Sequence, residues 1–199
     1  MEEDSPVTSF PVILEKDPLD EESPVAKESN CKVIYNVLSV VGRLKELLVT
    51  AGGENIPPVA IEQQVKSELP FISNAFLIGD KRKFLTILVT LKTEVDPETG
   101  IPRDNLTSEV KYWLRSIGCP AETVKEVLAA GPDKRVLDEL LKGIERVNKQ
   151  ATSNAQTIKK ISVLPADFSI PTGELGPTMK VKRRIVEQKY KDIIERMYS

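Results

Sequence analysis

Histidine is absent from this sequence of 199 residues, and cysteine occurs only twice, as Cys31 and Cys119. Without histidine, the chain itself cannot provide Ser-His or Cys-His nucleophilic catalysis, histidine-ligated metal sites or histidine acid–base chemistry. Two cysteines are too few for a disulfide framework or a thiolate zinc cage, so a reducing compartment is the simpler setting. These absences exclude several common kinds of catalytic and metal site.

Long hydrophobic runs are also missing. No uninterrupted apolar run approaches the roughly 20 residues that a membrane-spanning helix needs, and the first residues are acidic where an export signal would be basic. We therefore expect a cytoplasmic protein that meets the endoplasmic reticulum or another membrane only peripherally. Apolar residues still make up 40% of the sequence, which is enough to close a core.

Charge is unevenly distributed along the chain. The net charge is −2, but residues 1–30 carry nine acidic side chains against two lysines, so this segment is −7 and the remainder +5. The segment also holds four prolines and has only one apolar cluster, at residues 10–14. It cannot bury enough apolar surface to offset the entropy of ordering. We expect residues 1–30 to be a disordered leader and residues 31–199 to form one folded domain.

Apolar periodicity and turn residues in the folded part predict a single α+β unit. Two hairpins are expected, one turning at Gly42–Arg43 and one at the polar segment 80–83. Residues 96–104 are expected to be a turn-rich loop. Strands are predicted at 33–41, 44–50, 74–79, 84–91 and 158–164, and helices at 57–69, 108–117, 121–129, 134–151 and 181–198.

Two glycine-bearing segments have the composition of sites for anionic ligands. In the first, Gly42 and Arg43 are followed by Gly52, Gly53 and Glu54. A guanidinium can form paired hydrogen bonds with phosphate or ribose oxygens, and adjacent glycines let the backbone approach a ligand closely. A hairpin turn followed by an ordinary loop gives the same pattern, and short motifs have many false positives.

The second segment, residues 172–184, contains Gly173, Gly176 and Lys180 just before a basic helix. A lysine on a glycine loop can act as a point charge that stabilises negative charge developing in a transition state. A solvated run of charges is the simpler explanation of such a segment. The cationic turn at 80–83 is best explained as a soluble hairpin end, with phosphate binding as a weaker alternative.

Together these segments resemble a known family. Residues 42–62 resemble the hinge-and-loop motif of acyl-adenylate-forming enzymes, and residues 175–183, Leu-Gly-Pro-Thr-Met-Lys-Val-Lys-Arg, resemble their terminal lysine motif. The amino-acid sequences of both motifs, and of residues 69–84 between them, are similar to those of the bubblegum group of long-chain fatty acyl-CoA synthetases. Two long motifs in the right order, about 130 residues apart, are a strong signal.

The resemblance implies a fold and a reaction. The fold is a small mixed sheet of hairpins packed with helices, as in the C-terminal domain of these enzymes. The reaction uses ATP, Mg²⁺ and a long-chain fatty acid to form an acyl-adenylate and pyrophosphate, and CoA then displaces AMP. The C-terminal domain rotates between the two steps.

By the same resemblance, Lys180 matches the lysine that reaches the carboxylate and the α-phosphate during adenylation. Arg43 matches the arginine beside the hinge that contacts the nucleotide. Gly42 stands at the hinge position, where many relatives carry Asp. Residues 52–54 match the loop that lines the CoA tunnel during thioester formation.

The resemblance covers only a small domain of the family. No run in this sequence resembles the Ser/Thr/Gly-rich phosphate loop of the large domain that binds ATP and the acyl chain, and the stretch before Gly42 also departs from the family. We therefore expect a chain that is inactive alone and works only with a large domain or a full-length synthetase. The alternative is a non-catalytic module that docks on a synthetase or an anionic surface. Nucleic-acid binding is the weakest hypothesis, because aromatics make up only 5% and no nucleic-acid module is recognised.

Overall fold

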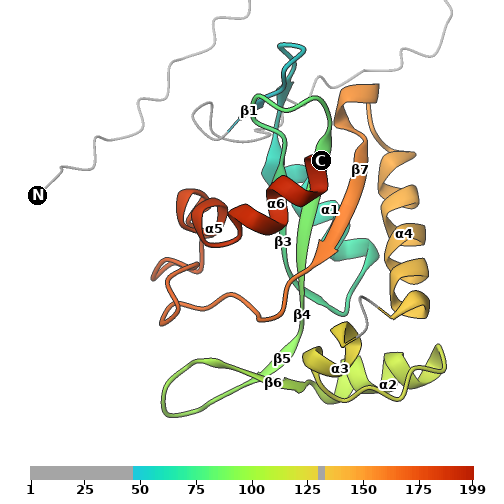
Figure 1. Cartoon of the computed structure of the whole chain (residues 1–199), viewed down its shortest axis with the longest axis vertical. Helices are drawn as coiled ribbons and strands as arrows, with labels where there is room; N and C mark the ends of the chain where they lie inside the picture. Colours follow the sequence, from blue (N-terminus) through green and yellow to red (C-terminus); the bar gives the residue numbers. More distant parts are fainter. Residues whose placement is uncertain (1–46, 130–132) are drawn as a thin grey trace, which may run out of the picture. The chain divides into compact units, whose positions relative to one another are not determined.

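A computed structural model describes residues 47–129 and 133–199. Its centre is the sheet β3-β4-β7, formed by Ile72–Ile78, Leu85–Leu91 and Ile158–Val163 (Figure 1). β3 and β4 are antiparallel, whereas β7 runs parallel to β4. Every residue of β4 is buried, as expected for the middle strand of a sheet covered on both faces. The predicted hairpin that turns at residues 80–83 is confirmed, and so are the α+β fold class and the mixed sheet.

The sheet separates two apolar clusters because side chains alternate between its faces. On β3, Ala75 and Leu77 point to one cluster, and Phe76 and Ile78 to the other. On β4, Leu88 belongs to the second cluster while its neighbours join the first. The domain therefore has helices packed on both faces of one sheet (Figure 1).

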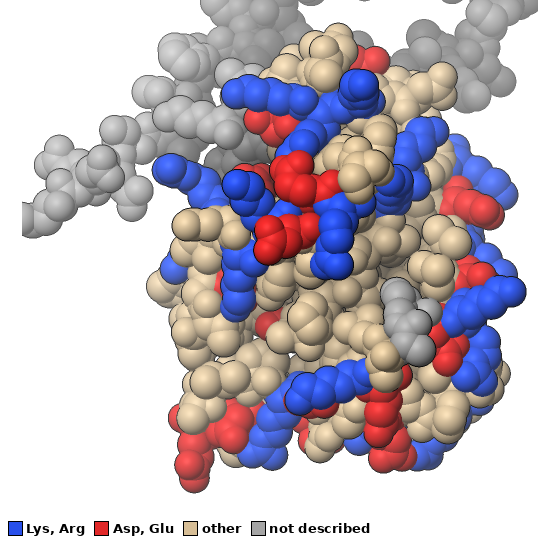
Figure 2. All heavy atoms as spheres, in the orientation of Figure 1, with Lys and Arg blue, Asp and Glu red and all other residues tan. Residues whose placement is uncertain are grey.

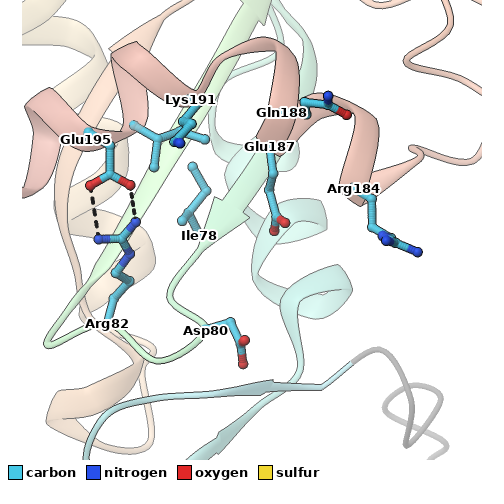
Figure 3. Close-up of a pocket in the computed structure, with 9 residues that line it drawn as sticks. Ile78, Asp80, Arg82, Arg184, Glu187, Gln188, Lys191 and Glu195 are labelled. Atoms are coloured by element: carbon cyan, nitrogen blue, oxygen red, sulfur yellow. Dashed lines mark hydrogen bonds and ion pairs between the residues drawn. The ribbon is translucent and has the colours of Figure 1, made fainter.

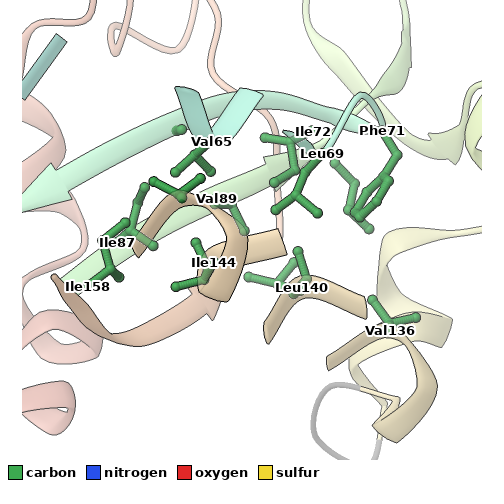
Figure 4. Close-up of a cluster of buried hydrophobic side chains, with 14 of the residues drawn as sticks. Val65, Leu69, Phe71, Ile72, Ile87, Val89, Val136, Leu140, Ile144 and Ile158 are labelled. Carbon is green, nitrogen blue, oxygen red and sulfur yellow. The ribbon is translucent and has the colours of Figure 1, made fainter. Parts of the chain in front are cut away.

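The first cluster lies under α1, Pro58–Glu68, and α4, Lys134–Asn148 (Figure 4). α1 begins with a proline at its first helical position, where the missing N–H is not needed. The two helices come close at Gly143, where an added Cβ would lie 2.3 Å from a methyl carbon of Leu69. A larger residue at this position would therefore require the Leu69 side chain to shift.

The second cluster lies under α5, Arg183–Lys189, and α6, Lys191–Tyr198. The sequence predicted one helix over 181–198, and this prediction is wrong. Tyr190 leaves the helical conformation, with φ −107° and ψ 21°, and its side chain is buried. The break lets both short helices turn apolar side chains, Val186 and Ile194 among them, toward the same sheet face.

Smaller elements complete the domain. β1, Leu48–Val49, pairs with β2, Asn55–Ile56. The turn-rich loop expected at 96–104 is confirmed for residues 96–101, which connect β5, Thr93–Val95, to β6, Pro102–Leu106, while residues 102–104 belong to β6. The helical elements that complete the description are α2, Ser108–Ser116, α3, Val124–Leu128, and the short 3-10 helix Asn154–Gln156.

α2 and α4 confirm two of the predicted helices, and α3 is shorter than the predicted 121–129. The expected leader at 1–30, the strand at 33–41 and the turn at Gly42–Arg43 lie outside the described residues. Within the described ranges, no helix is long and apolar enough to cross a membrane.

Candidate functional site

Lys180 lies near the end of a short closed loop, residues 174–182, which we call the lysine loop. Its ends are joined by a bridge between Leu175 and Val181. Inside this bridge, the Gly176 N–H donates to the Lys180 carbonyl at 2.8 Å, and the Met179 N–H donates to the Gly176 carbonyl at 2.9 Å. The backbone is thus fixed by its own hydrogen bonds, while Lys180 remains exposed to solvent.

Met179 adopts a left-handed backbone conformation, with φ 61°. A three-residue hairpin loop commonly ends in such a position, where glycine is favoured. An L-residue there costs roughly 1–2 kcal/mol. The Met179 side chain gains little burial in return, because it is 65% exposed. The loop therefore holds an unfavourable conformation directly beside Lys180.

Glu174 anchors the first end of the lysine loop. It is only 1% exposed, and its carboxylate accepts hydrogen bonds from Thr172, Lys189 and, at 3.4 Å, the Tyr190 hydroxyl. Burial by itself would raise the pKa of this carboxyl group, but the hydrogen bonds from Lys189 and Thr172 outweigh burial and hold the pKa below its ordinary value. Glu174 is therefore a buried, ionised carboxylate with a lysine partner.

Arg183 anchors the second end. Its guanidinium lies 2.8 Å from the Glu62 carboxylate on α1, donates to the Leu77 carbonyl on β3, and stacks 4.3 Å from the centroid of the Phe76 ring. The same Glu62 oxygen accepts the Leu77 N–H at 2.8 Å. Arg183, which follows Lys180 by three residues, thus connects α5 to α1 and β3.

A polar network fastens the segment before the lysine loop to the sheet. One carboxylate oxygen of Asp167 accepts from Asn74 at 2.8 Å, from the Thr90 hydroxyl at 2.5 Å and from the Phe168 N–H at 2.8 Å. The Thr90 hydroxyl in turn accepts the Asn74 N–H at 3.0 Å. β3, β4 and the chain that follows β7 are thereby connected near the lysine loop.

A surface groove of about 380 Å³ runs between α1, β3 and the lysine loop. Its lining includes the exposed Lys180, Lys66 of α1 and the Arg183 that is paired with Glu62. The exposed apolar side chains Val59 and Met179 also line it. The groove thus combines positive charge with apolar surface, an arrangement suited to an anionic group attached to a less polar body. Its full lining is Pro58, Val59, Glu62, Gln63, Lys66, Asn74, Ala75, Met179, Lys180, Val181 and Arg183.

Gly52, Gly53 and Glu54 form the exposed turn between β1 and β2. Gly53 has φ 80°, and its N–H donates to the Thr50 carbonyl at 2.9 Å, so the glycine is needed for the turn itself. The Glu54 carboxylate accepts from Ser153 at 2.8 Å. Figure 1 shows this turn and the chain between β7 and α5 in separate parts of the domain, so the structure does not bring Lys180 and the predicted CoA loop together.

Gly42 and Arg43, predicted as hinge and nucleotide contact, lie outside the described residues. The third predicted feature, the cationic turn at 80–83, contacts β1, because the Ala51 N–H donates to the Arg82 carbonyl at 2.9 Å and the Lys81 N–H to the Val49 carbonyl at 2.7 Å. Its explanation as a hairpin end is therefore consistent with the structure.

A second hollow, of about 490 Å³, lies between this turn and the helices α5 and α6 (Figure 3). Its charged side chains are of both signs. Arg82 forms an ion pair with Glu195 across it and stacks 4.6 Å from the Tyr198 ring centroid. The ion pair fixes α6 to the β3–β4 hairpin, and we assign no ligand to this hollow.

Acidic side chains do not gather into a metal site in the part of the chain that is described. Across residues 47–129 and 133–199, no group of three or more metal-ligating side chains is placed to hold an ion.

The fold and the lysine loop define a class of protein. The chain belongs to the family of AMP-binding enzyme C-terminal domains, whose model matches residues 45–115 and 119–199. The predicted resemblance to bubblegum-type enzymes is confirmed by its relatives: the chain is 52% identical over 162 residues to the long-chain-fatty-acid–CoA ligase ACSBG1 of Rattus norvegicus. It is 51% identical to ACSBG2 of Xenopus laevis over 162 residues and 46% identical to the ligase heimdall of Drosophila melanogaster over 181 residues.

The match covers 81% of this chain in each of these three comparisons, but only 22%, 22% and 27% of the respective relatives. Among solved structures, the adenylation domain of a carboxylate reductase from Mycobacterium chelonae matches with a TM-score of 0.55 at 20% identity, covering 79% of this chain and 20% of that one. The corresponding domain from Segniliparus rugosus, solved with AMP and a carboxylic acid, matches with a TM-score of 0.52 at 19% identity, covering 79% and 20%. These structures establish the shared fold.

Lys180 is identified from the sequence, whereas Glu174 and the pair of Glu62 and Arg183 are not, although Glu62 and Arg183 lie in the two quoted motifs and Glu174 directly precedes the second motif. Their importance depends on burial and on contacts between residues up to 121 positions apart. A glutamate beside a glycine in a charged segment carries no sign that its carboxylate will be buried. Only the folded structure reveals these supports.

Proposed function

We propose that the described domain acts as the mobile C-terminal part of a cytoplasmic long-chain fatty acid–CoA ligase. The overall reaction converts fatty acid, ATP and CoA into acyl-CoA, AMP and pyrophosphate. The identity of about 50% with three ligases supports the reaction class. The single observation that carries the role of this domain is an exposed lysine held on a loop that is closed by its own hydrogen bonds.

Lys180 is proposed to act in the first step. There a carboxylate oxygen of the fatty acid attacks the α-phosphorus of ATP, the bond from that phosphorus to the bridging oxygen breaks, and pyrophosphate leaves. Negative charge gathers on the α-phosphate oxygens during this exchange. The ammonium group of Lys180 would stabilise that charge, and its fixed backbone reduces the reorganisation needed to do so.

The turn at residues 52–54 is proposed to act in the second step, in which the CoA sulfur attacks the acyl carbon and AMP leaves. Gly52 and Gly53 would let the pantetheine arm pass close to the backbone. We propose Gly42 as the hinge and Arg43 as a nucleotide contact on the basis of the motif alone. The turn at 52–54 and the chain between β7 and α5 lie in separate parts of the domain (Figure 1), which supports a domain that presents a different face in each step.

Mg²⁺ has no fitting set of ligands among the described side chains. Because Mg²⁺ prefers oxygen ligands from carboxylates and substrate phosphates, we expect the phosphates of ATP to provide part of its coordination. We assign no step of this domain to the metal.

The decisive experiment places residues 45–199 in the rat ligase in exchange for the matching region, with Lys180→Ala and Lys182→Ala as paired variants. Lys182 is an exposed lysine of the same loop. Removal of one preorganised stabilising group commonly lowers rates by about 10²–10³. We expect Lys180→Ala to lower acyl-adenylate formation by that order, while Lys182→Ala stays within about threefold of the parent. Equal rates for the two variants would contradict the proposal.

The 199-residue chain is assayed alongside with palmitate, ATP, Mg²⁺ and CoA. A lysine with no ATP and fatty acid bound beside it has no developing charge to stabilise, so we expect no acyl-CoA above the level of the Lys180→Ala chain. Turnover by the chain alone would show that it binds ATP and fatty acid itself.

The alternative of a module that docks on an anionic surface finds less support. Figure 2 shows Lys and Arg side chains interspersed with Asp and Glu on the face that carries α5 and α6, so that face is not uniformly basic. Docking on a full-length synthetase is tested by adding the chain to the rat ligase. Unchanged activity and complex size would exclude it.

A further inference from the structure

We propose that Glu174 is a positioning residue that fixes Lys180 for the adenylation step. This inference rests on the proposed function of Lys180. Glu174 does not itself approach the groove, and its role is to hold both ends of the lysine loop. The lysine loop would then deliver its ammonium group to one place instead of sampling several.

Glu174 forms the first end of the lysine loop and is hydrogen-bonded to its second end. Its carboxylate is fixed by Thr172 before the loop and by Lys189 of α5 after it. Its backbone carbonyl accepts the Lys182 N–H at 2.7 Å, directly outside the bridge between Leu175 and Val181. A shift of Glu174 would therefore also shift the backbone of the lysine loop that carries Lys180.

Because the Glu174 carboxylate is buried, its charge has to be compensated by neighbouring groups. A carboxylate that is 1% exposed needs charged or hydrogen-bonding partners, and Glu174 has Lys189, Thr172 and Tyr190. Lys189 is 44% exposed, so it can keep its charge hydrated while it reaches the buried oxygen. The ion pair ties the loop to α5, as the contact of Arg183 with Glu62 ties it to α1.

Accurate placement matters for a group that acts only in a transition state. A misplacement of 1 Å can lower a rate by roughly 10²-fold, even when the altered residue does not touch the substrate. Loss of the Glu174 anchor should therefore lower the rate of adenylation more than it alters the binding of ATP. The thioester step, which we assign to the turn at 52–54, should be affected little.

The first test measures backbone amide exchange in the full 199-residue chain, comparing the parent with Glu174→Gln. Glutamine keeps the shape of the side chain but removes its charge. We expect exchange at the amides of Gly176 and Lys182 to accelerate at least tenfold, with the amides of β4 unchanged. Equal acceleration in the loop and in β4, or no acceleration anywhere, would overturn the inference.

The second test measures the two half-reactions in the exchanged rat ligase. For both Glu174→Gln and Lys189→Gln, we expect the kcat of adenylation to fall at least tenfold, with KM for ATP and the rate from preformed acyl-adenylate and CoA within about twofold. Glu109→Gln, which removes a carboxylate paired with Lys92 at 3.0 Å on the surface, is the matched control and should leave both steps unchanged.

The outcomes separate this inference from the proposed function. If Lys180→Ala leaves adenylation intact, the function proposed for Lys180 fails, and the positioning role fails with it. If Lys180→Ala abolishes adenylation but Glu174→Gln does not lower it, only the positioning role is wrong. A parallel loss of both half-reactions in Glu174→Gln would indicate general structural damage and would also overturn the positioning role.

Discussion

Arg183 and Glu62 form an ion pair at 2.8 Å between two helices whose contacting residues are 121 positions apart in the sequence. Both side chains are largely buried, with 22% and 13% exposure. Glu62 also accepts the Leu77 N–H, and Arg183 also donates to the Leu77 carbonyl, so both groups bind the edge of β3 as well as each other. The pair fixes the start of α5, and with it the lysine loop, to the rest of the domain.

Glu62→Gln should therefore be clearly destabilising. The amide oxygen can still accept the Leu77 N–H, but Arg183 loses its counter-charge in a partly buried position. We expect the free energy of unfolding, measured by urea denaturation, to fall by about 2 kcal/mol. Glu139→Gln removes one partner of the surface pair with Lys142 at 2.7 Å and should change it by about 0.5 kcal/mol or less. Similar losses in both variants would contradict this difference.

Gly143→Ala should destabilise the domain even though alanine is the better helix former. Alanine gains about 1 kcal/mol of helix propensity, but its Cβ would lie 2.3 Å from a methyl carbon of Leu69, the residue that follows α1. Overpacking of a core typically costs about 1–3 kcal/mol, so we expect a net loss of up to about 2 kcal/mol in urea denaturation. Glu145→Ala, at an exposed position of the same helix, should be neutral or slightly stabilising. A gain in stability for Gly143→Ala would show that Leu69 moves aside freely.

Local sequence patterns predict those elements whose ends or buried faces are marked by residues close together in the sequence. The segment from Pro57 to Pro70 contains both the start and the end of α1, and Val136, Leu140 and Ile144 mark the buried face of α4. Turn residues at 80–83 between two dense apolar runs identified the β3–β4 hairpin. Each of these signals depends on neighbours in the sequence, so it was visible without the fold.

The remaining features depend on distant parts of the chain. The strand predicted at 158–164 does not indicate that β7 pairs in parallel with β4, because no local pattern encodes a partner more than 70 residues away. The break at Tyr190 follows from fitting two helices to one sheet face. At the site, Lys180 was found through its motif, whereas Glu174 becomes interpretable only when its burial is known.

Met179→Gly should stabilise the lysine loop. Glycine adopts the φ of 61° without a steric penalty, and little apolar burial is lost with a side chain that is 65% exposed. The greater freedom of glycine in the unfolded chain offsets part of this gain, which leaves up to about 1 kcal/mol, or roughly 2–4 °C in Tm. Met179→Ala removes the side chain but keeps the strained backbone, and should give no gain. Equal stabilisation by both would show that strain is not the cause.

Tyr190 should make the stability of the domain sensitive to alkaline pH. Its hydroxyl is buried and lies 3.4 Å from the Glu174 carboxylate, so that burial, followed by the negative charge of Glu174, raises the pKa of Tyr190 to about 12. An unfolded tyrosine has a pKa of about 10. Between these two values the unfolded chain releases the proton and the folded chain retains it. The stabilisation is therefore fully present below about pH 10 and is lost as the pH rises toward 12.

Tyr190→Phe tests this dependence. Between pH 9 and pH 11, the free energy of unfolding from urea denaturation should fall more steeply for the parent than for Tyr190→Phe, because phenylalanine has no proton to release. Lysine deprotonation affects both proteins, so the comparison isolates the hydroxyl. Tyr112→Phe, on a side chain that is 78% exposed, is the control and should follow the parent. If the parent and Tyr190→Phe lose stability in parallel, the Tyr190 hydroxyl is not held protonated by the fold, and its contact with Glu174 does not contribute to the anchor of the lysine loop.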